Sequence, residues 1–328
     1  MFQNKINITT IWGWTGTYNV LSGLKFNESY NLAAIVTMSD SGWSTGLLRD
    51  EFGVLPPGDI RRAILALSNE SEILRKLFEY RFDKESSVSG HTVGNLLLTA
   101  LADITWDFGD GIKEINKMFK VKGKVIPVTM EQSNLCVELE NGQKVCGESN
   151  IDVPAHDSDL RIIDAYLEPE VKANSVAKTA LANSDIIVIG PGDLYTSIVP
   201  NLLVKWVKKA IKNSNAKVVY FCNIMTKKWE TSGFEVNDFV DVIEKYLGKW
   251  VLDYVVVNDG NISDYMVKKY KDSEGKKPVK IKDKTKKELI DKWYKVIERD
   301  MLHEQDFVRH SSKKIASIID DLVDGWVK

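Results

Sequence analysis

The stretch Ile6-Asn-Ile-Thr-Thr-Ile-Trp-Gly-Trp-Thr-Gly-Thr17 decides the fold that this sequence predicts. Its first half, residues 6–11, is a short apolar run with β-branched side chains, which is typical of a buried strand. A turn rich in glycine and threonine follows, and residues 17–25 are predicted as a helix. Glycine lets backbone N–H groups approach an anion at the start of a helix. The stretch therefore predicts a strand, a phosphate-holding turn and a helix, although Trp12 and Trp14 stand where such a turn favours glycine.

The same alternation of strand and helix continues along the chain. Further buried strands are predicted at residues 31–37, 185–189, 217–223, 253–258 and 294–297. Helices are predicted at residues 60–68, 74–80, 92–105, 111–119, 198–212, 237–247, 262–271 and 312–323. Alternation of this kind produces a parallel sheet with helices on both faces. The sequence thus predicts a three-layer α/β/α, Rossmann-like fold of the α/β class, with residues 1–328 in a single domain.

The middle of the chain interrupts this alternation. Strands are predicted at residues 124–128, 135–138, 144–146 and 160–167, and Asn141-Gly142 is a hairpin signal between two of them. We therefore expect a small antiparallel excursion at about residues 124–170 from a mostly parallel sheet. A lysine-rich segment near the C-terminus is interpreted as solvated surface, and it covers residues 271–292.

Two segments after the second strand are predicted to be irregular. Residues 38–48 form a polar, glycine-bearing loop. Residues 53–58 contain two prolines and form a rigid turn, because proline is unfavourable inside a helix. Asp59 is then expected to be the N-cap of the helix at 60–68.

Composition excludes several classes of protein. The 328 residues carry a net charge of −2, with no basic surplus that would suggest a nucleic-acid partner. No apolar run approaches the ~20 residues that cross a bilayer, and the N-terminus lacks the apolar core of a signal peptide. Cys136, Cys146 and Cys222 offer no paired framework and no CxxC motif. We expect a cytoplasmic protein with reduced cysteines and no structural zinc.

Polar, glycine-bearing loops follow several of the predicted strands. In open α/β sheets, ligands bind beyond the carboxyl ends of the strands. Each loop alone is equally consistent with a plain turn, but their coincidence predicts a phosphorylated or nucleotide ligand. The candidate phosphate- and nucleotide-binding residues are Gly13, Thr15, Gly16, Thr17, Ser39, Asp40, Ser41, Gly42, Asp59, Arg62, Asn95, Gly190, Gly192, Leu194, Tyr195, Thr196, Ser197, Asn223 and Asn258.

Two residues are candidates for catalysis. Asp40 suits a metal ligand, a general base or a ribose contact, and the alternative is an Asx-turn. His91 suits a general acid or base, and the alternative is a histidine satisfied at the start of a helix. Arg62 suits a clamp on a diphosphate, and the alternative is ordinary surface charge. The chain has neither a Walker A loop nor a GxSxG elbow, and no firm metal site beyond Asp40.

Five motifs together resemble one family. They are Gly13-x-Thr-Gly-Thr-Tyr18, Met38-Ser-Asp-Ser-Gly42, Arg49-Asp-Glu-Phe-Gly-Val-Leu-Pro-Pro-Gly-Asp-Ile-Arg-Arg62, His91-Thr-Val-Gly-Asn95 and Gly190-Pro-Gly-Asp-Leu-Tyr-Thr-Ser-Ile198. With them the whole chain resembles the CofD-like superfamily, and specifically its bacterial YvcK, or gluconeogenesis factor, branch. Proteins of this branch regulate cell shape and carbon use and bind UDP-sugars. The CofD branch instead transfers a phospholactyl group from a guanylylated donor to a deazaflavin, with a divalent metal.

The resemblance implies roles for particular residues. Residues 13–17 and 190–197 would form the phosphate cradle, and Asp40 matches an acidic position that lies at the deazaflavin site of the transferase branch. Tyr270 and Arg309 look like a tyrosine and an arginine tied to UDP-sugar binding.

Three functions follow from the resemblance. The leading one is a UDP-sugar-binding regulator that needs no cofactor, has a metabolic or cell-wall partner and forms a homodimer. One alternative is a CofD-type transferase that uses Mg²⁺, so enzymatic turnover stays open. The other alternative is a scaffold with a blocked site.

The departures from the family pattern concentrate on tryptophan. Tryptophan stands where the family usually has glycine at Trp12, Trp14, Trp43, Trp106, Trp206, Trp229 and Trp293. Indole at such positions would fill the space that phosphates need and would resist positive φ. We hypothesise that the gene reads the UGA codon as glycine but has been translated with a table that reads it as tryptophan. UGG codons at these positions would contradict the hypothesis. Trp250 and Trp326 are the least clear cases.

Overall fold

The computed structural model describes residues 5–83, 86–154, 160–304 and 307–327. Its centre is a seven-stranded parallel sheet with the strand order β10-β9-β8-β7-β1-β2-β3. These strands are β1 (Ile6–Ile11), β2 (Tyr30–Val36), β3 (Lys124–Pro127), β7 (Ile186–Ile189), β8 (Lys217–Phe221), β9 (Tyr254–Asn258) and β10 (Lys295–Arg299). The strand order reverses between β1 and β7, so their carboxyl ends are the topological switch point of the sheet. The predicted α/β fold class is confirmed.

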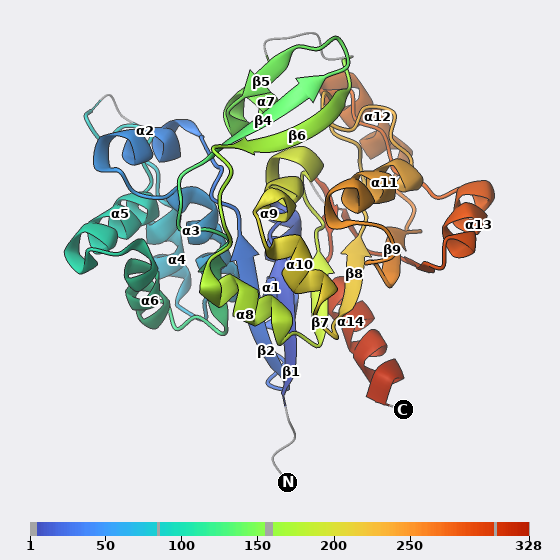
Figure 1. Cartoon of the computed structure of the whole chain (residues 1–328), viewed down its shortest axis with the longest axis horizontal. Coiled ribbons are helices and arrows are strands. Elements are labelled where there is room, and N and C mark those ends of the chain that lie inside the picture. The colour runs from blue at the N-terminus through green and yellow to red at the C-terminus, as the bar shows by residue number, and fades with distance from the viewer. Residues whose placement is uncertain (1–4, 84–85, 155–159, 305–306, 328) are drawn as a thin grey trace.

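Helices cover both faces of this sheet (Figure 1). One layer contains α1 (Thr15–Leu24), α3 (Pro57–Leu67), α4 (Glu72–Glu79), α5 (Val93–Thr105), α6 (Phe108–Met118) and α14 (Ser312–Val327). The other contains α8 (Ser175–Ala182), α9 (Val199–Leu203), α10 (Val207–Lys212), α11 (Val236–Leu247) and α13 (Asp283–Asp291). Alternate strand residues enter the two cores, as Val218 and Val219 of β8 do. Because both faces are buried, the strands are near-continuous apolar runs, which is why the sequence reveals them.

A second, three-stranded antiparallel sheet stands beyond the carboxyl ends of the main strands, at the top of Figure 1. It contains β4 (Asn134–Leu139), β5 (Lys144–Cys146) and β6 (Ile162–Glu168), and the short helix α7 (Glu148–Asp152) follows β5. Gly142 in the β4–β5 turn has φ 82°, as the hairpin signal predicts. The excursion begins later than predicted, because β3 pairs parallel with β2 at the edge of the main sheet. A four-residue apolar run does not itself specify which sheet it joins.

A hairpin near the C-terminus packs against α12 (Asp264–Glu274). Its strands are β11 (Leu302–Glu304) and β12 (Val308–His310), and neither is among the predicted elements. Helices α8 and α13 are also absent from the prediction, and α13 lies within the lysine-rich segment. Across the described residues, no helix is both long and apolar enough to span a bilayer.

Three local predictions are wrong. The predicted loop at 38–48 runs into α2 (Trp43–Phe52). Helix α3 begins at Pro57, so Asp59 lies in its first turn and is not its N-cap. Proline is favourable there because its missing N–H would be unpaired in any case. The predicted helix at 198–212 is divided into α9 and α10, and Trp206, at φ 82°, stands at the start of α10.

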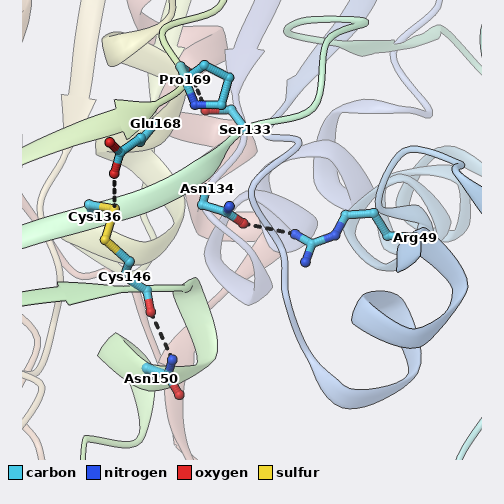
Figure 2. Close-up of a disulfide and its surroundings, with 8 residues drawn as sticks. All are labelled: Arg49, Ser133, Asn134, Cys136, Cys146, Asn150, Glu168 and Pro169. Atoms are coloured by element: carbon cyan, nitrogen blue, oxygen red, sulfur yellow. Dashed lines mark hydrogen bonds between the residues drawn. A yellow bond between two sulfur atoms is a disulfide. The ribbon is translucent and has the colours of Figure 1, made fainter. Parts of the chain in front are cut away.

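The cysteine prediction is also wrong, because Cys136 and Cys146 form a disulfide between β4 and β5 (Figure 2). The two residues face each other across the antiparallel hairpin, so the turn that the sequence does predict brings them together. Cys222 is free and buried. The bridge lies directly before α7, whose Asn150 donates a 2.8 Å hydrogen bond to the Cys146 carbonyl.

Candidate functional site

The loops after β1 and β7 touch each other at the switch point. A Cβ on Gly13 would lie 2.4 Å from the Pro191 oxygen, and one on Gly16 would lie 2.1 Å from the same oxygen. A Cβ on Gly192 would lie 1.9 Å from the Gly13 oxygen. These glycines are required because two backbone segments are in contact, and Gly190 is required by its φ of 67°. The two predicted cradle segments are therefore neighbours.

The Thr17 hydroxyl holds this pair of loops together. It accepts a 2.7 Å hydrogen bond from the Gly13 N–H and donates to the Pro191 carbonyl at 3.3 Å. Thr17 is completely buried, so its hydroxyl serves the fold. Thr15 and Gly16, by contrast, line an open cavity.

A cavity of about 440 Å³, here called the carboxylate pocket, lies beside these loops. Three of the carboxylates that line it come from distant segments: Asp40 follows β2, Asp59 belongs to α3 and Glu148 belongs to α7. Asp40 accepts hydrogen bonds from the Gly42 N–H at 2.8 Å and the Thr45 hydroxyl at 3.0 Å. The Asx-turn that was the alternative for Asp40 is thus present, while Asp40 still lines the cavity.

Burial changes the protonation of two of these groups. Burial, and then repulsion from Asp40, raise the pKa of Asp59 to about 7. The same two causes raise the pKa of Glu148 to about 8. Carboxyl groups that titrate near neutral pH are suited to proton transfer. The pocket therefore combines a roomy cavity with groups that can gain or lose a proton under physiological conditions.

Lys227 marks the boundary between this pocket and a second one. Its ammonium contacts Asp152 of α7, and it lies 2.9 Å from Asp193 and 2.7 Å from Glu230. Burial alone would lower the pKa of Lys227, but the carboxylates, Glu230 foremost, raise it above its ordinary value. The cluster ties α7, and with it the small sheet, to the loop after β7.

The second cavity, of about 330 Å³, is here called the tyrosine pocket. Tyr270 of α12 and Arg309 of β12 line it, together with Thr15, Gly16 and Asn223 from the ends of β1 and β8. The two residues that the family resemblance ties to a UDP-sugar therefore share a cavity with part of the predicted phosphate loop.

Two side chains of the tyrosine pocket are positioned by the backbone around them. The Tyr270 hydroxyl accepts a 3.2 Å hydrogen bond from the Val308 N–H. Asn223 donates to the Gly192 carbonyl at 2.8 Å. The buried side-chain oxygen of Asn223 has no hydrogen-bond partner within the described chain. An acceptor is thus left over on a residue that lines the cavity.

Several other predicted residues are engaged within the protein. The buried His91 ring places Nδ1 2.9 Å from the Ser44 hydroxyl, which matches the satisfied-histidine alternative. Asn258 bonds to the backbone of Gly260 and Met301. Residues that pack within the protein are Ser39, Ser41, Leu194 and Tyr195. Residues that line the carboxylate pocket are Gly42, Arg62, Asn95, Thr196 and Ser197.

Sequence reasoning missed Glu148, Asp152, Lys227 and Glu230. Lys227 and Glu230 are three residues apart, but Glu148 and Asp152 come from α7 and reach the site only when α7 docks on the main sheet. One docking contact is a 3.0 Å hydrogen bond from the Ser149 N–H to the Ser41 hydroxyl.

A larger hollow, of about 1190 Å³, lies at the opposite edge of the sheet. Lys5, Asn7 and Tyr30, at the amino ends of β1 and β2, line it. Ligands of parallel sheets bind at the carboxyl ends, so the candidate site is assigned to the two pockets around Lys227.

The fold and the site define an α/β protein of the doubly wound class with two adjoining cavities at its switch point. Comparison with known proteins narrows this class. The family model "2-phospho-L-lactate transferase CofD" matches residues 8–302. The gluconeogenesis factor of Bacillus subtilis is 38% identical over 97% of this chain and 98% of its own length. The gluconeogenesis factor of Listeria innocua is 38% identical over 97% and 95%.

A solved structure agrees with these sequence matches. A crystal structure of a UPF0052 family member from Bacillus halodurans superposes with a TM-score of 0.90 at 38% identity, covering 96% of this chain and 99% of that one. The chain therefore belongs to the CofD family, and within it to the gluconeogenesis factor branch, as the motifs predict.

Proposed function

We propose that this protein is a UDP-sugar-binding regulator of the gluconeogenesis-factor type, which acts in the cytoplasm on cell shape and central carbon metabolism. One observation carries the proposal. Tyr270 and Arg309 come from separate elements, yet they line one pocket with Thr15, Gly16 and Asn223. Arg309 supplies a cation, the backbone at the start of α1 favours phosphate, and Asn223 offers a spare acceptor.

Calorimetry with UDP-N-acetylglucosamine tests the proposal. The chain with tryptophan at positions 12, 14 and 43 is compared with a form that has glycine at these three positions. The glycine form is expected to bind, and Arg309→Gln within it should weaken binding about tenfold or more, since it removes a charge-assisted contact worth ~1.5–3 kcal/mol. The matched control is Arg161→Gln, an exposed arginine outside the pocket. No binding by the glycine form would overturn the UDP-sugar proposal.

A second candidate function is favoured by the carboxylate pocket. Asp40, Asp59 and Glu148 offer oxygen ligands of the kind that Mg²⁺ prefers, with two pKa values near neutrality. These properties suit a CofD-type transfer of a phospholactyl group to a deazaflavin. Turnover of a guanylylated donor with Mg²⁺, abolished by Asp40→Asn, would support the transferase. If the protein shows neither binding nor turnover, the remaining alternative is a scaffold with a blocked site.

A further inference from the structure

Six tryptophans occupy backbone that favours glycine. Their φ angles are positive and range from 55° at Trp14 to 82° at Trp206. The other four are Trp106, Trp229, Trp250 and Trp293. A residue with a Cβ is crowded by its own backbone in this region, and for a bulky side chain such a φ is an outlier. The strain is therefore repeated at six separate places.

The strain follows residue type. Among the described residues, Lys120 is the one other non-glycine with positive φ. Asparagine and aspartate tolerate this conformation best after glycine, and neither adopts it in the part of the chain that the structure describes. Yet tryptophan accounts for just nine of the 328 residues. A common cause linked to tryptophan explains this pattern better than six independent functional strains do.

The helix ends show which residue this backbone conformation favours. Gly53 ends α2 at φ 68°, and Gly275 ends α12 at φ 64°. Trp106 ends α5 in the same left-handed conformation, at φ 59°. Glycine is the usual residue at this position because it has no Cβ. Trp106 therefore stands in the place of a helix-ending glycine.

Packing does not compensate for the strain at the exposed positions. Trp106 is 92% exposed, Trp293 is 87% exposed and Trp250 is 76% exposed. A large apolar side chain normally gains stability by burial, and these indoles gain almost none. Nothing in their surroundings requires tryptophan.

Trp14 has a consequence for the site. It lines the carboxylate pocket, the tyrosine pocket and a third cavity of about 300 Å³ that also contains Arg62 and Arg309. The Arg62 guanidinium lies 4.2 Å from the centre of a Trp14 ring. The indole is the common wall of three hollows, and it packs against Arg62, which lines two of them.

We propose that the natural protein carries glycine at positions 14, 106, 206, 229, 250 and 293, because its gene uses the UGA codon for glycine. At positions 12 and 43 the backbone has no positive φ, and only the family motif indicates glycine there. With glycine at 14, the three hollows form one cleft, and Arg62 faces an elongated anionic ligand such as a nucleoside diphosphate derivative. The anionic ligand of this cleft rests on the proposed function, whereas the assignment of glycine at the six positions rests on the backbone alone.

Peptide mass spectrometry of the protein purified from the organism that carries the gene tests the assignment. The peptides are expected to contain glycine at the six positions, and the gene is expected to have UGA codons there. UGG codons, or peptides with tryptophan, would overturn the assignment. This result does not depend on ligand binding, so it separates failure of the assignment from failure of the proposed function.

Recombinant variants test the backbone argument. Trp106→Gly should raise Tm by about 2 °C or more, and Trp106→Ala should raise it less, because alanine keeps the crowded Cβ. The control is Trp43→Gly, which should give no such gain in Tm, because Trp43 begins α2 and has no positive φ. Equal gains for glycine and alanine at 106 would contradict the requirement for glycine.

The continuous cleft is tested at position 14 alone. Trp14→Gly should strengthen binding of UDP-N-acetylglucosamine at least tenfold over Trp14→Phe, which keeps an aromatic wall. Equal affinities would overturn the cleft while leaving the peptide assignment intact.

Discussion

The Lys227 ammonium lies 2.7 Å from the Glu230 carboxylate, whose side chain is completely buried. Removing the ammonium would leave Glu230, Asp193 and Asp152 without their counter-charge. We expect Lys227→Met to lower the free energy of unfolding by about 3–5 kcal/mol, as for other broken buried ion pairs. Lys227→Arg keeps the positive charge and should lower the free energy of unfolding by less. Urea denaturation measures both, and an equal loss would contradict the electrostatic explanation.

The raised pKa values of Asp59 and Glu148 predict a pH dependence of stability. Both exceed the ordinary values of 3.8 and 4.5, so the folded state binds protons more tightly than the unfolded state does. Their contribution is complete below about pH 4 and is lost as the pH rises through about 7 and 8. For each of the two groups this contribution is on the order of 4 kcal/mol, because one pKa unit corresponds to ~1.4 kcal/mol. Asp59→Asn and Glu148→Gln should flatten this decline in unfolding free energy between about pH 5 and 8, and an unchanged slope would show that the two carboxyls do not cause it.

Reduction of the Cys136–Cys146 bridge should destabilise the protein. The cysteines are ten residues apart, and a loop of this size corresponds to about 2–3 kcal/mol in the chain-entropy model. Dithiothreitol should therefore lower Tm. The control is Cys136→Ser, which has no bridge and should not respond to the reductant. A response of equal size in this variant would rule out the bridge as its source.

Gly192→Ala should open the contact between the loops after β1 and β7. The added Cβ would meet the Gly13 carbonyl at 1.9 Å, and overpacking of this kind costs about 1–3 kcal/mol. Gly325→Ala is the control, because Gly325 lies within α14 and a Cβ there would meet no heavy atom within 4 Å beyond the adjacent helix backbone. That variant should be neutral, or up to about 1 kcal/mol more stable. Thermal unfolding distinguishes the two, and a neutral Gly192→Ala would show that the loops do not need to touch.

Thr17→Val should lower the stability of the protein, because the buried Thr17 hydroxyl supports the fold and does not contact a ligand. The change removes the acceptor of the Gly13 N–H and leaves that buried group unpaired, at a cost of about 1–3 kcal/mol. Thr17→Ser keeps the hydroxyl and should stay close to the parent protein. If Thr17→Val unfolds like the parent but no longer binds a nucleotide, the hydroxyl is a ligand contact and the structural role is wrong.

The candidate site was predictable only in part. Thr15, Gly16, Asp40 and Asn223 follow strands, and any parallel sheet places the carboxyl ends of its strands at one edge. Glu148 follows β5 of the small sheet, and nothing local shows that α7 will dock against the loop at Ser41. Contacts between distant segments have no periodic signature, so Glu148 and Lys227 of the carboxylate pocket could not be foreseen.

The sequence by itself determined that this chain alternates buried strands and helices around a parallel sheet, because burial on two faces requires apolar runs of a recognisable length. Through the family resemblance it also indicated several positions where glycine is expected and tryptophan stands. Only the tertiary structure decided that the strand order reverses between β1 and β7, and that α7 reaches Lys227. It added Trp250, whose positive φ is a property of the folded backbone and has no sign in composition or spacing. Long-range packing sets these features, and local preference does not encode it.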